Sequence, residues 1–213
     1  MTVAVKEKSK KAVKEATTIK PKKIPEDLIY EIIEGEIFYR KGYRDVVEKR
    51  KKIEEIMGST GLQSYLVGLV LQFLFKNPEG KKYKILAIEL GNNLGLRNNI
   101  LHDIAIFDRK SILHELKDVK YVKSPPLVSI EVDMRTDLEN STEMDYIKKK
   151  TDKLLEVGVE KVFWILSQPK LIMVCEKEKD WVLIPFYKSF TILESIKVNL
   201  DQLLREEEKL SEE

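Results

Sequence analysis

Three residues of this sequence have types and surroundings suited to metal-assisted phosphodiester chemistry: Asp103, Glu131 and Lys150. Asp103 and Glu131 lie in short segments rich in β-branched residues, which predicts two strands. A carboxylate in such a strand is costly to bury without a partner, and two carboxylates on adjacent strands could share a divalent cation, which prefers oxygen ligands. The simpler alternative is that each acid is solvated or pairs with a surface lysine.

Lys150 belongs to a predicted helix over residues 140–157. At about 100° per residue, Lys150 falls on the apolar side of that helix, whereas the three neighbouring lysines do not. An inward ammonium needs an acidic partner, unless its stem lies along apolar surface with the amine in water. Two strand carboxylates and an inward helix lysine form a constellation for phosphodiester cleavage, in which a metal acidifies a bound water and the lysine stabilises the transition-state charge.

The elements that must position these residues can be predicted from pattern. Residues 29–39 read as a β-hairpin with Gly35 at its bend, and residues 62–75 as a long core helix that ends before Pro78. Residues 45–57 have a helical pattern, 91–95 read as a turn, Asn140 or Ser141 can cap the 140–157 helix, and Gly158 ends it. Strands are predicted over residues 83–90, 101–107, 127–133, 162–166, 171–175 and 181–187.

This order predicts an α/β (α+β) fold, a mixed β-sheet flanked by helices. A doubly wound nucleotide-binding fold is excluded because the strand–helix alternation and a Gly-rich phosphate loop are both missing. On the 101–107 strand, alternation puts Asp103 on one face and His102 on the other, with Ile104. On the 127–133 strand, it puts Glu131 on the same face as Asp133.

Composition is that of one globular domain, residues 25–204, with two charged ends. Residues 1–24 carry eight lysines against two glutamates, a net charge of +6, which leaves −4 for the rest of the chain. This segment is expected to be disordered, and it either attracts a polyanion or only solubilises the protein. Residues 205–213 form an acidic end. No secretory signal or membrane span is visible, and Cys175 is the one cysteine, so a cytoplasmic protein is expected.

The chain resembles the Uma-type restriction endonuclease family of the PD-(D/E)XK nuclease superfamily. The resemblance rests on residues 125–132 (PPLVSIEV), on Lys150 eight residues before Gly158, and on residues 158–165 (GVEKVFWI). Residues 102–105 occupy the place of the family's "PD" strand, and residues 30–36 look like its N-terminal hairpin. The resemblance spans roughly residues 28–200.

The resemblance implies a restriction-endonuclease-like fold and a Mg²⁺-dependent endonuclease that hydrolyses DNA, with Mn²⁺ as an alternative ion. By this resemblance Asp103, Glu131 and the Val132 carbonyl are metal ligands and Lys150 is the catalytic lysine. Nucleases of this superfamily often act as dimers, so a homodimer is one implied assembly. The secondary site candidates are Glu34, Glu36 and Asp133, of which the first two can equally be turn residues of the hairpin.

The sequence departs from the family pattern at several positions. His102 replaces the usual proline, Gln63 replaces a histidine of the first long helix, and Leu154 replaces a tyrosine; Ile100 stands where an arginine is expected, and Asp133 opens a segment that is commonly Ser-Pro-Ser. These departures leave open a catalytically weakened protein of the nuclease fold that binds nucleic acid or a protein partner without cleavage. A third alternative is an inert structural homologue kept for dimerisation.

Overall fold

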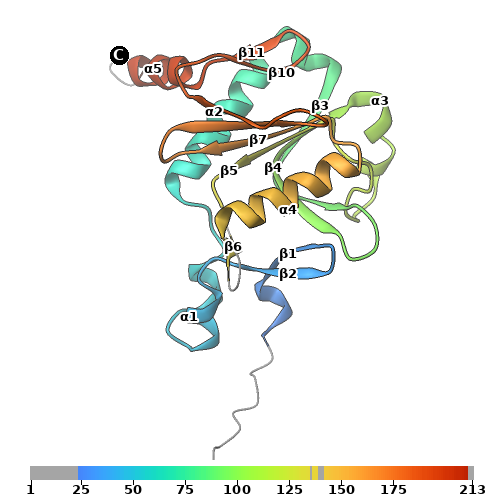
Figure 1. The fold of residues 1–213 in the computed structure, drawn as a ribbon, viewed down its shortest axis with the longest axis vertical. Coiled ribbons are helices and arrows are strands. Elements are labelled where there is room, and N and C mark those ends of the chain that lie inside the picture. Colours follow the sequence, from blue (N-terminus) through green and yellow to red (C-terminus); the bar gives the residue numbers. More distant parts are fainter. Residues whose placement is uncertain (1–23, 135, 139–141, 211–213) are drawn as a thin grey trace, which may run out of the picture.

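A nine-stranded mixed sheet runs through the computed structural model, which describes residues 24–134, 136–138 and 142–210 (Figure 1). Its order is β6-β2-β1-β4-β5-β7-β8-β9, and β3 pairs with β4 beside this path. The β5–β7 pair is parallel and the other pairs are antiparallel. The strands are β1 (Ile29–Ile33), β2 (Glu36–Arg40), β3 (Tyr83–Asn93), β4 (Asn99–Asp108), β5 (Val128–Val132), β6 (Thr136–Asp137), β7 (Lys161–Leu166), β8 (Leu171–Glu176) and β9 (Val182–Pro185).

Helices cover both faces of this sheet, as predicted (Figure 1). One core lies between the sheet and α2 (Gly61–Lys76), and it is closed by α5 (Leu200–Leu210) and by a hairpin of β10 (Phe190–Leu193) and β11 (Ile196–Val198). A second core lies under α4 (Glu143–Glu156) and contains Trp164 and Cys175. Burial raises the pKa of the Cys175 thiol to about 12, consistent with a small buried apolar residue. The remaining helical segments are α1 (Tyr43–Val47), α3 (Arg109–Ile112) and 3-10 turns at Glu26–Leu28, Ile53–Glu55, Pro78–Lys82 and Glu115–Lys117.

The predicted hairpin is confirmed, and the backbone conformation of its turn explains why a glycine stands there. Glu34 and Gly35 both have positive φ, at 53° and 84°, the conformation that a two-residue turn of a twisted hairpin requires. The extents of α2 and of strands β4, β5, β7, β8 and β9 also agree with the predictions to within a few residues.

Three local predictions are wrong. Residues 45–57 form only the short helix α1 and a 3-10 turn, because this charged stretch has no continuous apolar stripe to bury. The turn expected over 91–95 begins later, since β3 continues to Asn93 and the Leu94 amide closes on the Asn98 carbonyl. Helix α4 is capped by Thr142, which forms a reciprocal pair with Asp145; the predicted caps Asn140 and Ser141 lie outside the described residues.

Strand β4 carries a fork that positions the polar residues of the next section. β3 pairs along one edge of β4. Because a strand has only two edges, β1 and β5 must share the second edge of β4. On that edge β1 pairs with β4 at Asn99, and β5 pairs with it from Ile104 onward. Between them, residues 100–103 face no paired strand on that edge within the described chain. The main-chain groups of this stretch are therefore open to side chains.

Helices long and apolar enough to cross a membrane do not occur in the described ranges. The basic segment 1–24 falls, except for Ile24, outside those ranges, as do residues 211–213. The division into a tail, a domain of residues 25–204 and an acidic end therefore stays a prediction.

Candidate active site at the fork of the sheet

The side chain of Lys150 points inward, as helical phase predicts. It is 1% exposed, and its ammonium donates to the Leu101 carbonyl at 2.8 Å and to Glu131 Oε2 at 3.0 Å. Glu31 Oε2 lies 3.3 Å away, and the Trp164 ring lies 5.6 Å from the nitrogen. Burial would lower the pKa of this amine, but the charges of Glu131 and Glu31 outweigh it and raise the pKa. Lys150 is thus a buried, charged lysine, and the alternative with its amine in water is wrong.

Glu131 uses both carboxylate oxygens in hydrogen bonds. Oε2 accepts from Lys150, and Oε1 accepts from the Ser129 hydroxyl at 2.7 Å. The His102 Nδ1 atom lies 3.5 Å from the same Oε1. Burial would raise the pKa of the carboxyl, but the Lys150 ammonium, helped by His102 and Ser129, lowers it to about 2. Glu131 is therefore an anion at any ordinary pH.

Asp103 lies beside Glu131 at the point where β4 and β5 separate. Their pairing ends at Ile104 and Ile130, so Asp103 and Glu131 are the next residue on each strand. The buried Asp103 Oδ2 accepts the Val132 amide at 2.8 Å. The Val132 carbonyl accepts the Gln63 side-chain amide at 2.7 Å. The structure thus brings together Asp103, Glu131, Lys150 and the Val132 main chain.

Two further residues join this cluster that sequence reasoning did not single out, Glu31 and Tyr146. Glu31, on β1, is 1% exposed; its Oε2 accepts the Leu101 amide at 3.1 Å and its Oε1 accepts the Tyr146 hydroxyl. Tyr146 precedes Lys150 by one helical turn on α4, and burial together with Glu31 raises its phenolic pKa far above the usual value. The spacing of Tyr146 and Lys150 was the one available signal, since residues four apart share a helix face.

His102 extends the hydrogen-bonded cluster to β3. Its Nδ1 lies 2.7 Å from Ser129 Oγ and its Nε2 lies 3.2 Å from Asn92 Oδ1. The Asn92 amide donates to two main-chain carbonyls, which fixes Oδ1 as the acceptor and makes Nε2 of His102 a donor. The prediction that His102 shares a face with Ile104 is therefore wrong: Ile104 packs in the core under α2, whereas His102 contacts Ser129, because strict alternation fails where β4 leaves its pairing with β5.

The secondary candidates lie elsewhere. Glu34 and Glu36 are exposed at the hairpin turn, where Glu36 pairs with Lys149. Asp133 directly follows β5, has a φ of 54°, and accepts the Ser167 amide at 2.8 Å. Glu34 and Glu36 thus have the position of turn residues, and Asp133 lies at the rim of a pocket.

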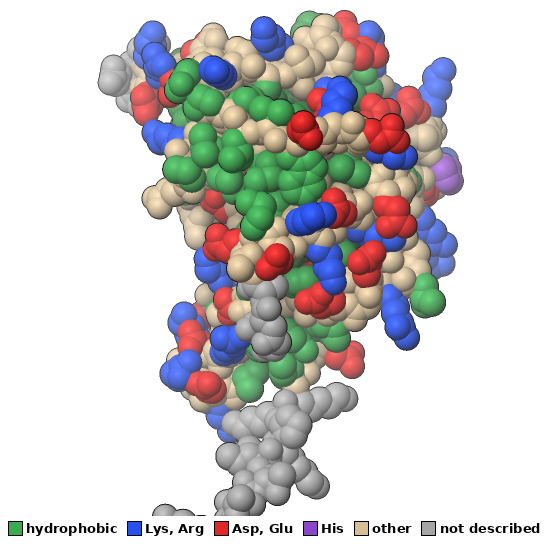
Figure 2. All heavy atoms as spheres, in the orientation of Figure 1, with side chains coloured by type: hydrophobic (Ala, Val, Ile, Leu, Met, Phe, Trp, Pro, Cys, Tyr) green, Lys and Arg blue, Asp and Glu red, His purple; other side chains and the backbone are tan. Residues whose placement is uncertain are grey.

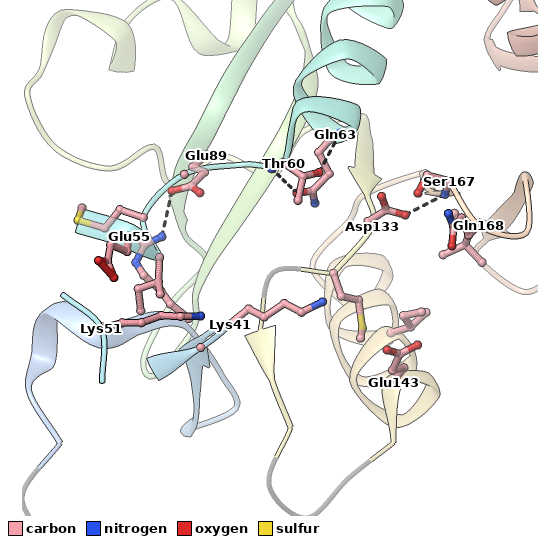
Figure 3. Close-up of a pocket in the computed structure, with 18 residues that line it drawn as sticks. Lys41, Lys51, Glu55, Thr60, Gln63, Glu89, Asp133, Glu143, Ser167 and Gln168 are labelled. Atoms are coloured by element: carbon pink, nitrogen blue, oxygen red, sulfur yellow. Dashed lines mark hydrogen bonds and ion pairs between the residues drawn. The ribbon is translucent and has the colours of Figure 1, made fainter. Parts of the chain in front are cut away.

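That pocket, of about 670 Å³, opens beside the buried cluster. Gln63, which binds the Val132 carbonyl, and Ile147, one turn before Lys150, both line it. Figure 3 shows Lys41 extending across the pocket and Asp133 with Ser167 on the opposite wall. Asp133, the residue after β5, lines this pocket, whereas Asp103, Glu131 and Lys150 do not.

Charge on the visible surface is mixed. Figure 2 shows lysine and arginine interspersed with aspartate and glutamate on the face that carries α4, and apolar side chains gathered beside them. On the edge strand β9, Val182 and Leu183 are 50% and 53% exposed. This face therefore presents no single-sign field for a polyanion.

The oxygen atoms of the cluster suit a hard cation, although they do not form a complete cage. Within the described ranges, no group of three His, Cys, Asp or Glu side chains is arranged to hold a metal ion. Mg²⁺ commonly binds through one or two carboxylates and keeps several waters. Asp103 and Glu131 are two such carboxylates, and the Val132 carbonyl has a second lone pair beside the one used by Gln63.

Comparisons with known proteins identify the fold. No family model and no curated protein matches the chain. A solved structure does: a crystal structure of "a putative nuclease belonging to DUF820" from Anabaena variabilis ATCC 29413 matches with a TM-score of 0.60 over 82% of this chain and 89% of that one. The two are 14% identical in sequence, so the likeness confirms the predicted fold class alone. Membership of the Uma-type family stays a prediction.

Proposed function

We propose that this protein is a Mg²⁺-dependent endonuclease that hydrolyses DNA phosphodiester bonds at the fork of β4. The observation that carries the proposal is the buried ion pair of Lys150 with Glu131, with Asp103 on the adjacent strand. A charged lysine held beside two strand carboxylates supplies what phosphoryl transfer needs: oxygen ligands for a cation and a fixed positive charge. The fold shared with a protein described as a nuclease supports it.

In this proposal Lys150 acts as a fixed charge rather than as a base. Its carboxylate neighbours raise its pKa, so it holds its proton at neutral pH. Its ammonium would therefore stabilise the negative charge that develops on the phosphate oxygens. Because Lys150 binds the Leu101 carbonyl and Glu131 at the same time, its position is set before any substrate arrives.

Asp103 and Glu131 would hold the cation, with Mn²⁺ as an alternative to Mg²⁺. Bound there, the ion would polarise the phosphate and lower the pKa of a water. Glu131 is kept ionised by Lys150, so no proton has to leave before it serves as a ligand. Asp103 is oriented by the Val132 amide, which directs it toward the β5 main chain.

A second function is favoured by how fully the cluster is enclosed: a protein of this fold that binds nucleic acid or a protein partner without cutting. Asp103, Glu131 and Lys150 are 4%, 2% and 1% exposed. Both Glu131 oxygens already accept hydrogen bonds. A ligand would have to displace some of these bonds, which would weaken catalysis relative to an open site.

Plasmid nicking separates the two functions. We expect the wild-type protein to nick supercoiled DNA with Mg²⁺ or Mn²⁺ and not with EDTA, and we expect Glu131→Gln, Asp103→Asn and Lys150→Met each to lose most of the activity and keep a measurable residual rate. Lys148→Met is the matched control, because Lys148 is an exposed lysine of the same helix that pairs with Asp152. A gel shift that is sensitive to salt, persists in all variants and is unaccompanied by nicking would instead establish binding without cleavage.

A further inference from the structure

The Lys150 ammonium is within ion-pair distance of two carboxylates, Glu31 and Glu131, although a single carboxylate would balance its charge. Its ammonium has three donors, and three acceptors surround it: the Leu101 carbonyl, Glu131 Oε2 and Glu31 Oε2 at 2.8, 3.0 and 3.3 Å. Glu31 and Lys150 are each 1% exposed. A second buried carboxylate is costly in free energy, so its presence calls for an explanation beyond charge balance.

Glu31 is itself held firmly, from three different elements. It comes from β1, the Leu101 amide that it accepts belongs to β4, and the Tyr146 hydroxyl that it accepts belongs to α4. The Leu101 amide and carbonyl, which face no strand at the fork, are thus bound by Glu31 and by Lys150. Glu31 is therefore held in place by groups other than Glu131.

We propose that Glu31 is a positioning residue for the reaction: it holds the Lys150 ammonium in place while Glu131 is engaged elsewhere. This inference rests on the proposed function. Suppose that Glu131 turned from Lys150 to bind a cation. If Glu131 were the one carboxylate partner of the ammonium, the ammonium could then move away from its position in the site. With Glu31 and the Leu101 carbonyl still bound, Lys150 stays beside the reacting phosphate.

The kinetic test uses Glu31→Gln, because glutamine keeps the shape and one acceptor oxygen but removes the charge. We expect kcat for plasmid nicking to fall on the order of 10²-fold, as for a misplaced catalytic group, with KM unchanged within about threefold. Glu31→Asp keeps the charge and should recover part of kcat. Glu156→Gln is the control, since it removes the carboxylate of an exposed ion pair with Lys153 on α4, the helix that carries Lys150.

The decisive comparison is the double variant. If Glu31 acts through Lys150, Glu31→Gln will have no further effect on kcat in a Lys150→Met background, since residues that act as a unit are not additive. Full kcat in Glu31→Gln, or an equal loss of kcat in both backgrounds, would overturn the inference and leave Glu31 a structural residue.

Thermal unfolding tests the same coupling without cleavage. Glu31→Gln should lower Tm in the wild-type background and raise Tm in the Lys150→Met background, because there it removes a buried carboxylate that has lost its cation. The same sign in both backgrounds would refute the coupling, and with it the inference. If the variants show this sign reversal in Tm but the wild-type protein does not cut DNA, the proposed function is refuted. Glu31 then has no role in a reaction, and the ion pair is structural only.

Discussion

At the scale of single residues, the buried lysine has an energetic consequence that does not depend on any activity. Replacing Lys150 by methionine leaves Glu31 and Glu131 facing each other without a cation. Removing one partner of a buried ion pair typically costs about 3–5 kcal/mol. We expect Lys150→Met to lower the free energy of unfolding by about that amount, measured by urea denaturation.

The matched variant Lys148→Met should cost less than about 1 kcal/mol, because Lys148 forms an exposed pair with Asp152. Equal losses in the two variants would show that the Lys150 ammonium is hydrated in solution.

The low pKa of Glu131 predicts how stability depends on acid. The folded protein lowers this pKa from 4.5 to about 2, so the folded state binds the proton less well than the unfolded state. The resulting stabilisation is fully present above about pH 4.5 and is lost as pH falls toward 2. We expect the difference in unfolding free energy between wild type and Glu131→Gln to shrink over this interval, as followed by urea titrations at several pH values.

The raised pKa of Lys150 predicts how stability depends on pH in alkali. Its pKa is raised in the folded state above the ordinary 10.5, so its contribution is present below that pH and is lost only in stronger alkali. Between these limits the ion pair contributes a constant stabilisation. A wild-type advantage that vanished near neutral pH would contradict both assignments.

At the scale of elements, the β1–β2 hairpin matters because it brings Glu31 to the fork. Its turn depends on Gly35, whose φ is 84° and at which an added Cβ would lie 3.1 Å from Arg97 Cδ. Gly35→Ala should therefore cost about 1–2 kcal/mol of stability, because a side chain disfavours the left-handed region. Gly68, in the middle of α2, has nothing within 4 Å of an added Cβ.

Gly68→Ala is thus the control, and it should stabilise the protein by about 0.5–1 kcal/mol through helix propensity. Chemical denaturation of both variants measures the two effects. If Gly35→Ala were neutral, the turn would adopt another conformation in solution, and the placement of Glu31 by the hairpin would need revision.

At the scale of the whole molecule, charge is divided between a basic segment and a mildly acidic remainder. Residues 1–24 carry +6 and the rest carries −4. The face shown in Figure 2 has mixed charges, so we expect the basic segment to supply much of the attraction to DNA. Deleting it should weaken binding at low salt and flatten the plot of log K against log salt by about 0.9 for each DNA phosphate that the segment neutralises.

Fluorescence anisotropy with a labelled duplex measures that slope, and an unchanged Tm would show that the deletion leaves the domain intact. An identical salt dependence with and without the segment would assign it to solubility alone, which is the alternative that the sequence leaves open.

The sequence by itself determined most of the strands, the two main helices, the hairpin turn and the inward direction of Lys150, because each depends on a local period or on a residue with special backbone freedom. It did not predict the short strands β6, β10 and β11. It placed Asp103 and Glu131 in strands, and the structure shows that these strands, β4 and β5, are neighbours. The proposed catalytic roles of Asp103 and Glu131 remain predictions, as do the metal, the DNA substrate and a homodimer.

Only the tertiary structure decided which groups meet at Lys150. Glu31 lies 119 positions before Lys150, and Tyr30 and Glu31 are both buried. A register shift near Glu31 interrupts the alternation that would assign its face. The contact of Glu31 with Leu101 depends on β1 and β5 sharing one edge of β4, and strand order is set by long-range packing that no local pattern contains.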